Sequence, residues 1–180
     1  YSGIIFINYY NYLSIMDLNN SLKLYKLANK IIDKCRSKKF KISVAESCTG
    51  GLISSIITSI PGSSDVFECG FITYSNSSKR KFLNVSQNTL NLYGAVSEEV
   101  VIEMVNGLKL RTQSDILLAI SGIAGPGGGS KDKPEGLVWI SYALKNNNIS
   151  TAKQKFGPIG RELVREKSSI ESLKYLISLL

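Results

Sequence analysis

The segment DILLAIS, residues 115–121, restricts the fold more than any other feature, because its five inner residues form an unbroken apolar run. A strand with one solvent-facing side alternates apolar and polar residues, whereas a strand buried on both faces is apolar throughout. Burial on both faces is typical of a parallel strand with helices packed above and below it. The rest of the chain must therefore supply helices for both sides of a sheet.

Helical periodicity is present on both sides of this strand in the sequence. Apolar residues at steps of three and four predict an amphipathic helix over residues 21–38, with a buried side made of Leu24, Leu27, Ala28, Ile31 and Cys35. Ser97, followed by two glutamates, opens a helix that runs to residue 111, since acidic side chains are favoured in the first turn. A closing amphipathic helix is marked by Leu163, Ile170, Leu173, Ile177 and Leu180.

Four further segments predict strands, at residues 41–47, 66–75, 136–144 and 149–156. The last two flank a KNNN turn and form a hairpin. A short helix over 52–60, stopped by Pro61-Gly62, and a helical turn over 76–83 lie between the earlier strands. This order predicts an α/β fold, a three-layer α/β/α sandwich on a mixed sheet.

The chain contains no histidine, which excludes Ser-His-Asp triads, Cys-His dyads and nearly every common zinc site. Any catalysis must then use lysine, tyrosine, a carboxylate or the backbone. Three cysteines, at positions 35, 48 and 69, show no paired spacing, so disulfides and a metal site are not expected. We expect a protein of the reducing cytoplasm that needs no metal and no cofactor.

The formal net charge of +8 raises the possibility of a nucleic-acid partner. Much of the excess lies at Lys23, Lys26, Lys30 and Lys34, whose spacing puts them along one helix face. Such a stripe is usually a solvated face, and no aromatic or arginine stacking pattern accompanies it. We therefore expect no nucleic-acid partner.

The first 15 residues, YSGIIFINYYNYLSI, are apolar and uncharged but shorter than a membrane span, and they lack the basic start of a signal peptide. Met16 is the first methionine, so we expect the natural protein to begin there. Residues 1–20 are predicted to be an extension that is disordered or not native, followed by one domain over 21–180. No membrane partner is expected.

Three polar segments follow predicted strands, where open α/β sheets bind ligands. The first, AESCTGG, runs from Ala45 to a glycine pair at a helix start, whose amides favour an anion or a developing oxyanion. An ordinary helix cap by Ser47 or Thr49 is the alternative. Ser47 is a candidate nucleophile, and Cys48 is its rival.

The second segment, TYSNSSKRK, offers Tyr74 and Lys79. A lysine can replace histidine as the base for a serine if burial or neighbouring cations lower its pKa, and Arg80 and Lys81 could supply that effect. The basic run could instead be a solvated turn.

The third segment, residues 121–130, has five glycines but matches neither common nucleotide-binding fingerprint. It could be an anion nest or a flexible loop. Further on, Arg161 and Arg165 share a helix face and could clamp a phosphate or pair with nearby glutamates.

Taken together, AESCTGGL, GFITYSN with Lys79, YGAVSEEVV, SGIAGPGGGSKDKPEGLVW and GRELVR closely resemble the CinA C-terminal domain family, from about residue 22 to the end. The resemblance implies a mixed, mostly parallel five-stranded sheet with one antiparallel strand. It also implies hydrolysis of the carboxamide of nicotinamide mononucleotide to nicotinate mononucleotide and ammonia, in pyridine nucleotide recycling. A homo-oligomer, specifically a dimer, is expected by the same resemblance.

The resemblance also implies roles for single residues. Ser47, Tyr74 and Lys79 would be catalytic, and the helix start at Thr49 to Gly51 would stabilise the oxyanion. Substrate binding would fall to Glu46, Thr49, Gly50, Gly51, Ser121, Gly122, Gly125, Gly127, Arg161 and Arg165, with the phosphate held by the glycine-rich loop and the arginines. The alternative function is a catalytically silent nucleotide-binding regulatory module of the same fold.

Overall fold

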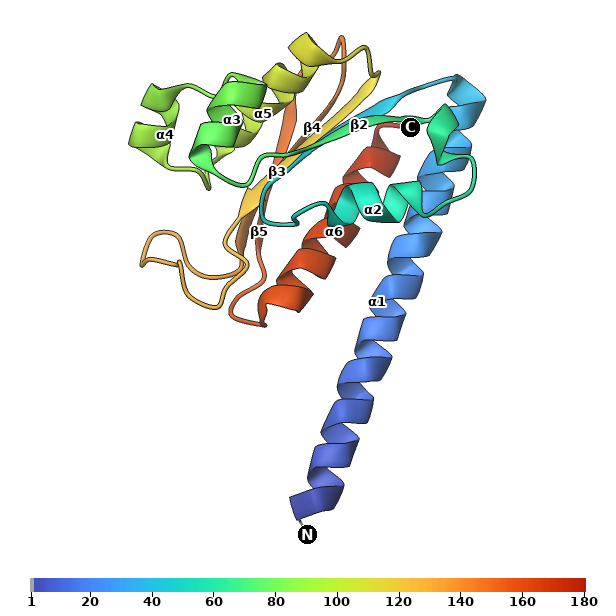
Figure 1. Cartoon of the computed structure of the whole chain (residues 1–180), viewed down its shortest axis with the longest axis vertical. Coiled ribbons are helices and arrows are strands. Elements are labelled where there is room, and N and C mark those ends of the chain that lie inside the picture. Colours follow the sequence, from blue (N-terminus) through green and yellow to red (C-terminus); the bar gives the residue numbers. More distant parts are fainter. Residues whose placement is uncertain (1) are drawn as a thin grey trace.

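The protein is described by a computed structural model that covers residues 2–180, with side chains described from Leu18 onward. The first helix, α1, spans Ser2–Lys38 (Figure 1). The predicted extension over residues 1–20 falls mostly outside the described side chains, so it stays a prediction, and Tyr1 lies outside the described residues altogether. Within the described part of the chain, no helix is long and apolar enough to cross a membrane.

The sheet has five strands in the order β2-β1-β3-β4-β5, namely β1 Ile42–Glu46, β2 Phe67–Ile72, β3 Ile116–Gly122, β4 Leu137–Leu144 and β5 Ser150–Lys155. Strand β1 pairs in parallel with β2 and β3, whereas β4 runs antiparallel to both β3 and β5. One strand therefore opposes the other four, and the predicted mixed sheet and the hairpin are confirmed.

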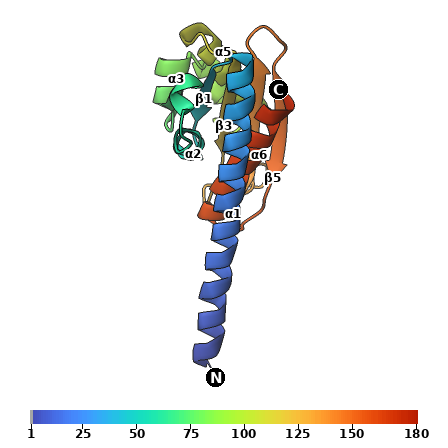
Figure 2. The same cartoon turned by 90° about the vertical axis from the view of Figure 1, so that its right-hand side faces the viewer.

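Helices cover both faces of this sheet (Figures 1 and 2). Helix α1 packs with α2 (Leu52–Thr58) and α6 (Arg161–Ser178) on one face. The opposite face carries α3 (Asn76–Leu83), α4 (Gln87–Tyr93) and α5 (Glu98–Arg111), and a 3-10 turn at Ser63–Asp65 precedes β2. The three-layer arrangement is therefore confirmed.

Strand β3 lies at the centre and separates two cores. Its side chains alternate, with Ile116, Leu118 and Ile120 facing α1 and α6, and Leu117 and Ala119 facing α5. All five are fully buried, as an unbroken apolar strand requires.

Helix α1 joins the first core through the predicted stripe, of which Leu24, Ala28, Ile31 and Cys35 are buried. Lys23, Lys26 and Lys30 are exposed and Lys34 is half-buried, so the solvated face is confirmed.

Helix α4 was not predicted. It has seven residues and a Ser86 cap, and only Leu90 is buried, while Leu92 and Tyr93 are exposed. A helix that buries a single side chain leaves no periodic signal in the sequence.

Candidate active site

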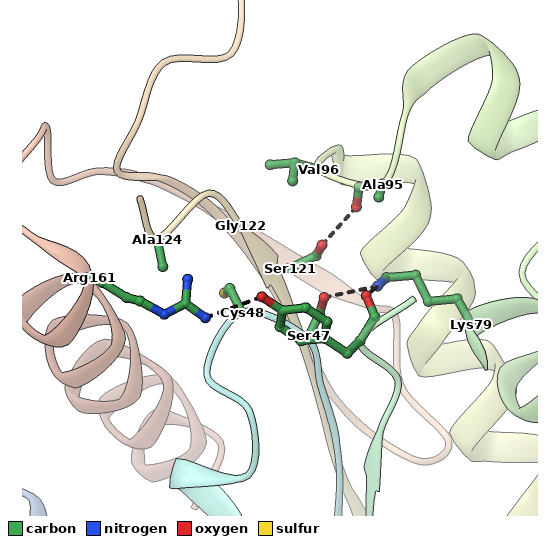
Figure 3. A pocket seen from close by; sticks show the side chains of 10 residues that line it. Ser47, Cys48, Lys79, Ala95, Val96, Ser121, Gly122, Ala124 and Arg161 are labelled. Carbon is green, nitrogen blue, oxygen red and sulfur yellow. Dashed lines mark hydrogen bonds between the residues drawn. The ribbon is translucent and has the colours of Figure 1, made fainter. Parts of the chain in front are cut away.

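The three parallel strands β1, β2 and β3 end at the same edge of the sheet, and this edge holds a pocket of about 160 Å³. Ser47 follows β1, Tyr74 follows β2 and Ser121 lies near the end of β3. The pocket is lined by Ser47, Cys48, Tyr74, Lys79, Ala95, Val96, Ser121, Gly122, Ala124 and Arg161. Figure 3 shows Lys79 and Arg161 reaching it from opposite sides.

Lys79 is brought to Ser47 by α3. Ser75 caps this helix by accepting a hydrogen bond from the Ser78 amide, which fixes the first turn so that Lys79 faces inward. The Lys79 Nζ atom lies 2.9 Å from Ser47 Oγ. Lys79 is 1% exposed and Ser47 is 7% exposed, so water has little access to either group.

Two backbone carbonyls orient the Lys79 nitrogen. It donates hydrogen bonds to the Thr73 oxygen at 2.7 Å and the Tyr74 oxygen at 3.3 Å. Carbonyl oxygens only accept, so in the neutral amine these two positions take the two N–H groups. The lone pair then points at Ser47 Oγ, which is the orientation that a general base requires.

Burial lowers the pKa of Lys79 from 10.5 to about 8, because the charged form loses its hydration. The expectation that Arg80 and Lys81 cause this shift is wrong, since both are exposed and burial is the cause that acts. The alternative, in which the basic run is exposed to solvent, holds for Arg80 and Lys81 but not for Lys79, which is buried.

Cys48 also lines the pocket, but the residue is only 4% exposed. Burial raises the pKa of Cys48 to about 12, so the thiolate is scarce at neutral pH. The environment therefore favours Ser47 over Cys48 as the nucleophile.

Tyr74 stands at the mouth of the pocket and is 60% exposed. Its hydroxyl accepts a hydrogen bond from Arg161 Nη2 at 3.2 Å, and Arg161 Nη1 donates to the Gly125 carbonyl at 3.1 Å. Arg161 thus ties together the β2–α3 connection, the glycine-rich loop and the start of α6.

Glu46 lies elsewhere than expected. Its carboxylate is fully buried and accepts hydrogen bonds from the amides of Gly51, Ile53 and Ser54, at 3.0, 3.1 and 2.8 Å, and from Ser54 Oγ at 2.6 Å. The side chain therefore caps α2 and does not line the pocket. The alternative cap by Ser47 or Thr49 is not formed either, and Thr49 Oγ1 has no hydrogen-bond partner among the described residues.

This cap changes the expected oxyanion site. The Gly51 amide donates to Glu46, and the Gly50 amide donates to the Ser47 carbonyl at 3.1 Å. In the described part of the chain, no oxygen accepts from the amides of Cys48 and Thr49, which adjoin the Cys48 sulfur. Of the amides expected over Thr49 to Gly51, only that of Thr49 donates to no protein oxygen among the described residues.

Arg165 does not reach the pocket. Its Nε and Nη2 atoms both donate to the Thr49 carbonyl, at 3.2 and 3.0 Å. Gly50 is exposed beside this guanidinium and has a φ of 61°, in the left-handed region that favours glycine. The two arginines therefore differ: Arg161 lines the pocket, and Arg165 braces the turn that carries Ser47.

The side chain of Glu135, which lies later in the same β3–β4 connection, occupies the glycine-rich loop. Gly127 donates its amide to Glu135 Oε2 at 3.0 Å, and the Glu135 side chain also lies against Gly125. Ser121 and Gly122 line the pocket, and Ser121 Oγ donates to the Ala95 carbonyl at 2.8 Å. The predicted anion nest thus already contains a carboxylate.

The sequence pattern of the CinA C-terminal domain family matches residues 24–180. This chain belongs to that family. It is 47% identical over 152 residues to the nicotinamide-nucleotide amidohydrolase PncC of Enterobacter agglomerans, covering 84% of this chain and 92% of the relative. It is also 44% identical to a CinA-like protein of Thermosipho melanesiensis, where it spans 85% of this chain but only 39% of the relative.

Solved structures agree with this assignment. The competence/damage inducible protein CihA of Agrobacterium tumefaciens superposes with a TM-score of 0.86 at 41% identity, covering 87% of this chain and 95% of that chain. A competence damage-inducible protein of Klebsiella pneumoniae gives a TM-score of 0.82 at 30% identity, covering 86% and 95%.

Several lining residues of this CinA domain were not predicted as site residues, namely Ala95, Val96 and Ala124. They are small and apolar, so no chemical signal marks them, although Ala95 and Val96 belong to the family stretch YGAVSEEVV. Among the residues that the structure describes, no cluster of three or more potential metal ligands is present.

Proposed function

We propose that this chain hydrolyses the carboxamide of nicotinamide mononucleotide to nicotinate mononucleotide and ammonia. The name of the Enterobacter agglomerans relative supports the reaction. The observation that carries the proposal is the buried Lys79 nitrogen, 2.9 Å from Ser47 Oγ, in a chain without histidine. We also place the reaction in pyridine nucleotide recycling in the cytoplasm and expect a dimer.

The first half of the reaction forms an ester on Ser47. Neutral Lys79 accepts the hydroxyl proton while Ser47 Oγ attacks the amide carbon. The resulting ammonium of Lys79 keeps its two carbonyl acceptors and gives the third proton to the departing nitrogen, so the C–N bond breaks and ammonia leaves. In the second half, water attacks the ester carbon while Lys79 accepts a proton from that water. Lys79 then gives this proton to Ser47 Oγ as the ester C–O bond breaks, so the nicotinate product leaves and both Ser47 and neutral Lys79 are restored.

The oxyanion of the tetrahedral intermediate needs hydrogen-bond donors next to Ser47. The amides of Cys48 and Thr49 serve best, because they directly follow the nucleophile and no protein oxygen occupies them. The amides deeper in α2 are excluded from this role because Glu46 takes them.

Tyr74 assists departure of ammonia or orients the reacting groups. Its hydroxyl oxygen accepts from Arg161, so its own proton remains available to a group in the pocket.

Ammonia release from purified protein and nicotinamide mononucleotide tests the proposal. Ser47→Ala and Lys79→Met should each lower kcat by at least about 1,000-fold, because they remove the nucleophile or its base. Cys48→Ala should keep most of the activity. An inactive Cys48→Ala protein beside an active Ser47→Ala protein would instead identify the thiol as the nucleophile.

The alternative, a silent nucleotide-binding module, predicts binding of the nucleotide without ammonia release at micromolar enzyme. The intact Ser47–Lys79 pair disfavours it, because a buried lysine without a carboxylate partner is costly to keep for binding alone.

A further inference from the structure

Two successive hydrogen-bonded turns carry the chain from Ser47 into α2. The first closes where the Gly50 amide donates to the Ser47 carbonyl at 3.1 Å. The second closes where the Leu52 amide donates to the Thr49 carbonyl at 3.3 Å. Thr49 belongs to both turns, so the direction of its carbonyl decides how the chain passes from the candidate nucleophile into the helix.

The second turn does not fix its own geometry. Its two central residues, Gly50 and Gly51, have φ angles of 61° and 95°, and positive φ at both positions is characteristic of a type I′ turn. Glycine adopts negative φ about as readily as positive φ, so a glycine pair selects neither this turn nor its mirror image. Contacts from outside the turn must therefore select it.

Arg165 supplies such a contact from α6. Its Nε and Nη2 atoms donate to the Thr49 carbonyl at 3.2 and 3.0 Å, and both distances are shorter than that of the Leu52 amide. The planar guanidinium presents its donors in a fixed geometry, so it restrains the direction of the carbonyl as well as its position. The orientation of Thr49 thus depends on a side chain from the far end of the sequence.

The amides proposed to bind the oxyanion lie between two anchors. At one end, the Ser47 amide donates to the Ile120 carbonyl of β3 at 3.1 Å. At the other end, Arg165 holds the Thr49 carbonyl. The amides of Cys48 and Thr49 lie within this short segment, so release of the second anchor lets both amides change direction.

We infer that Arg165 is a positioning residue for the proposed reaction: it holds the Thr49 carbonyl in one orientation and so keeps the amides of Cys48 and Thr49 directed at the oxyanion on Ser47. Arg165 does not line the pocket, so it acts through the turn and not on the substrate. It can act in this way only if Ser47 is the nucleophile, so the inference rests on the proposed function.

The separate effects on kcat and KM test this role. Arg165→Met should lower kcat for nicotinamide mononucleotide about 100-fold and leave KM within about twofold, because a displaced oxyanion donor is felt only in the transition state. Arg165→Lys should lower kcat roughly tenfold, since an ammonium can donate to the carbonyl but does not fix its direction. Loss of a phosphate contact would instead raise KM, and a change in KM alone would overturn the inference.

Arg36→Met is the matched control. Arg36 also donates to the carbonyl of a glycine with positive φ, that of Gly62 at 3.3 Å, but beyond the C-terminal end of α2. Its replacement should leave kcat unchanged. Urea unfolding followed by circular dichroism checks that every variant is folded. Arg165 variants that unfold at lower urea but keep the wild-type kcat while folded would show a purely structural role and overturn the inference.

Methanesulfonyl fluoride tests the same turn without the nucleotide. Ser47 Oγ forms a bond to sulfur, the S–F bond breaks as fluoride leaves, and Lys79 accepts the hydroxyl proton. Intact mass should show equal rates for the wild-type and Arg36→Met proteins and no modification of Ser47→Ala. Modification of Arg165→Met should be roughly tenfold slower or more.

This second measurement separates the two proposals. Sulfonylation that depends on Arg165, in a wild-type protein that releases no ammonia, would end the proposed function and keep the positioning role. A wild-type protein that neither releases ammonia nor is sulfonylated has no reactive Ser47, which ends both. Wild-type rates of both reactions in Arg165→Met would overturn the inference and leave the proposed function standing.

Discussion

In the proposed mechanism, the reactivity of the pocket depends on Lys79. A lysine on a solvated turn keeps its proton at neutral pH and cannot accept one from serine. Here α3 buries the side chain, and the two carbonyls of Thr73 and Tyr74 orient it. The sequence predicted the pairing of Lys79 with Ser47 but attributed the shift to neighbouring cations, because burial depends on contacts from other elements.

At this scale we predict the pH dependence of ammonia release. The base must be neutral, and the pKa of Lys79 is lowered to about 8, so kcat/KM should rise about tenfold per pH unit below 8 and level off above it. The chain has no histidine to produce a limb near pH 6.5. A rate that is flat between pH 6 and 9 would contradict Lys79 as the base.

Among the elements, α2 has a helix start whose amides bind a side chain of the protein itself and are therefore not available to a ligand. Its first amides are satisfied by the buried Glu46, and Arg165 of α6 braces the preceding turn at Thr49. Both residues were predicted to bind substrate, because a carboxylate and an arginine near a nucleophile look the same in a sequence whichever way they point.

We predict that Glu46→Ala destabilises the fold by about 3 kcal/mol, because three buried or half-buried amides and one hydroxyl lose their acceptor. Ser54→Ala, which removes only the hydroxyl donor, should cost about 1 kcal/mol. Urea unfolding followed by circular dichroism measures both. Equal losses in the two variants would show that the carboxylate cap contributes little.

The contact between α3 and α5 gives a second prediction. A Cβ at Gly107 would lie 2.2 Å from the Leu83 carbonyl oxygen, and backbone cannot yield as a side chain can. Gly107→Ala should therefore displace α3, which carries Lys79, and lower kcat on the order of 100-fold. It should also destabilise the fold by about 2 kcal/mol.

The control for this variant is Asn106→Ala, at the exposed neighbouring position of α5. It should leave both kcat and unfolding unchanged. Full activity in Gly107→Ala would mean that α3 does not need its present distance from α5 to position the base.

At the scale of the whole molecule, the described core includes α1 only from Leu24 onward. Figure 1 shows the first half of this helix extending beyond the sheet. The free energy of unfolding of a chain that begins at Met16 should therefore differ by no more than about 0.5 kcal/mol from that of the longer chain, because the shorter chain keeps every described core contact.

Thermal unfolding of the two chains checks this prediction. A clear loss of stability on shortening would show that the residues before Met16 contribute to the fold.

The sequence by itself determined the strand at the centre, the three layers, the strand edge at which the candidate site lies and the absence of imidazole catalysis. These follow from periodicity and residue type, which local segments express on their own. Only the tertiary structure decided which polar groups are engaged: Arg165 donates to the distant Thr49 carbonyl, Glu135 folds back onto Gly127, and Glu46 caps the helix that follows it. A hydrogen bond depends on the positions of both its partners, and the burial that shifts a pKa depends on the elements that surround the group. Both are set only when the elements pack.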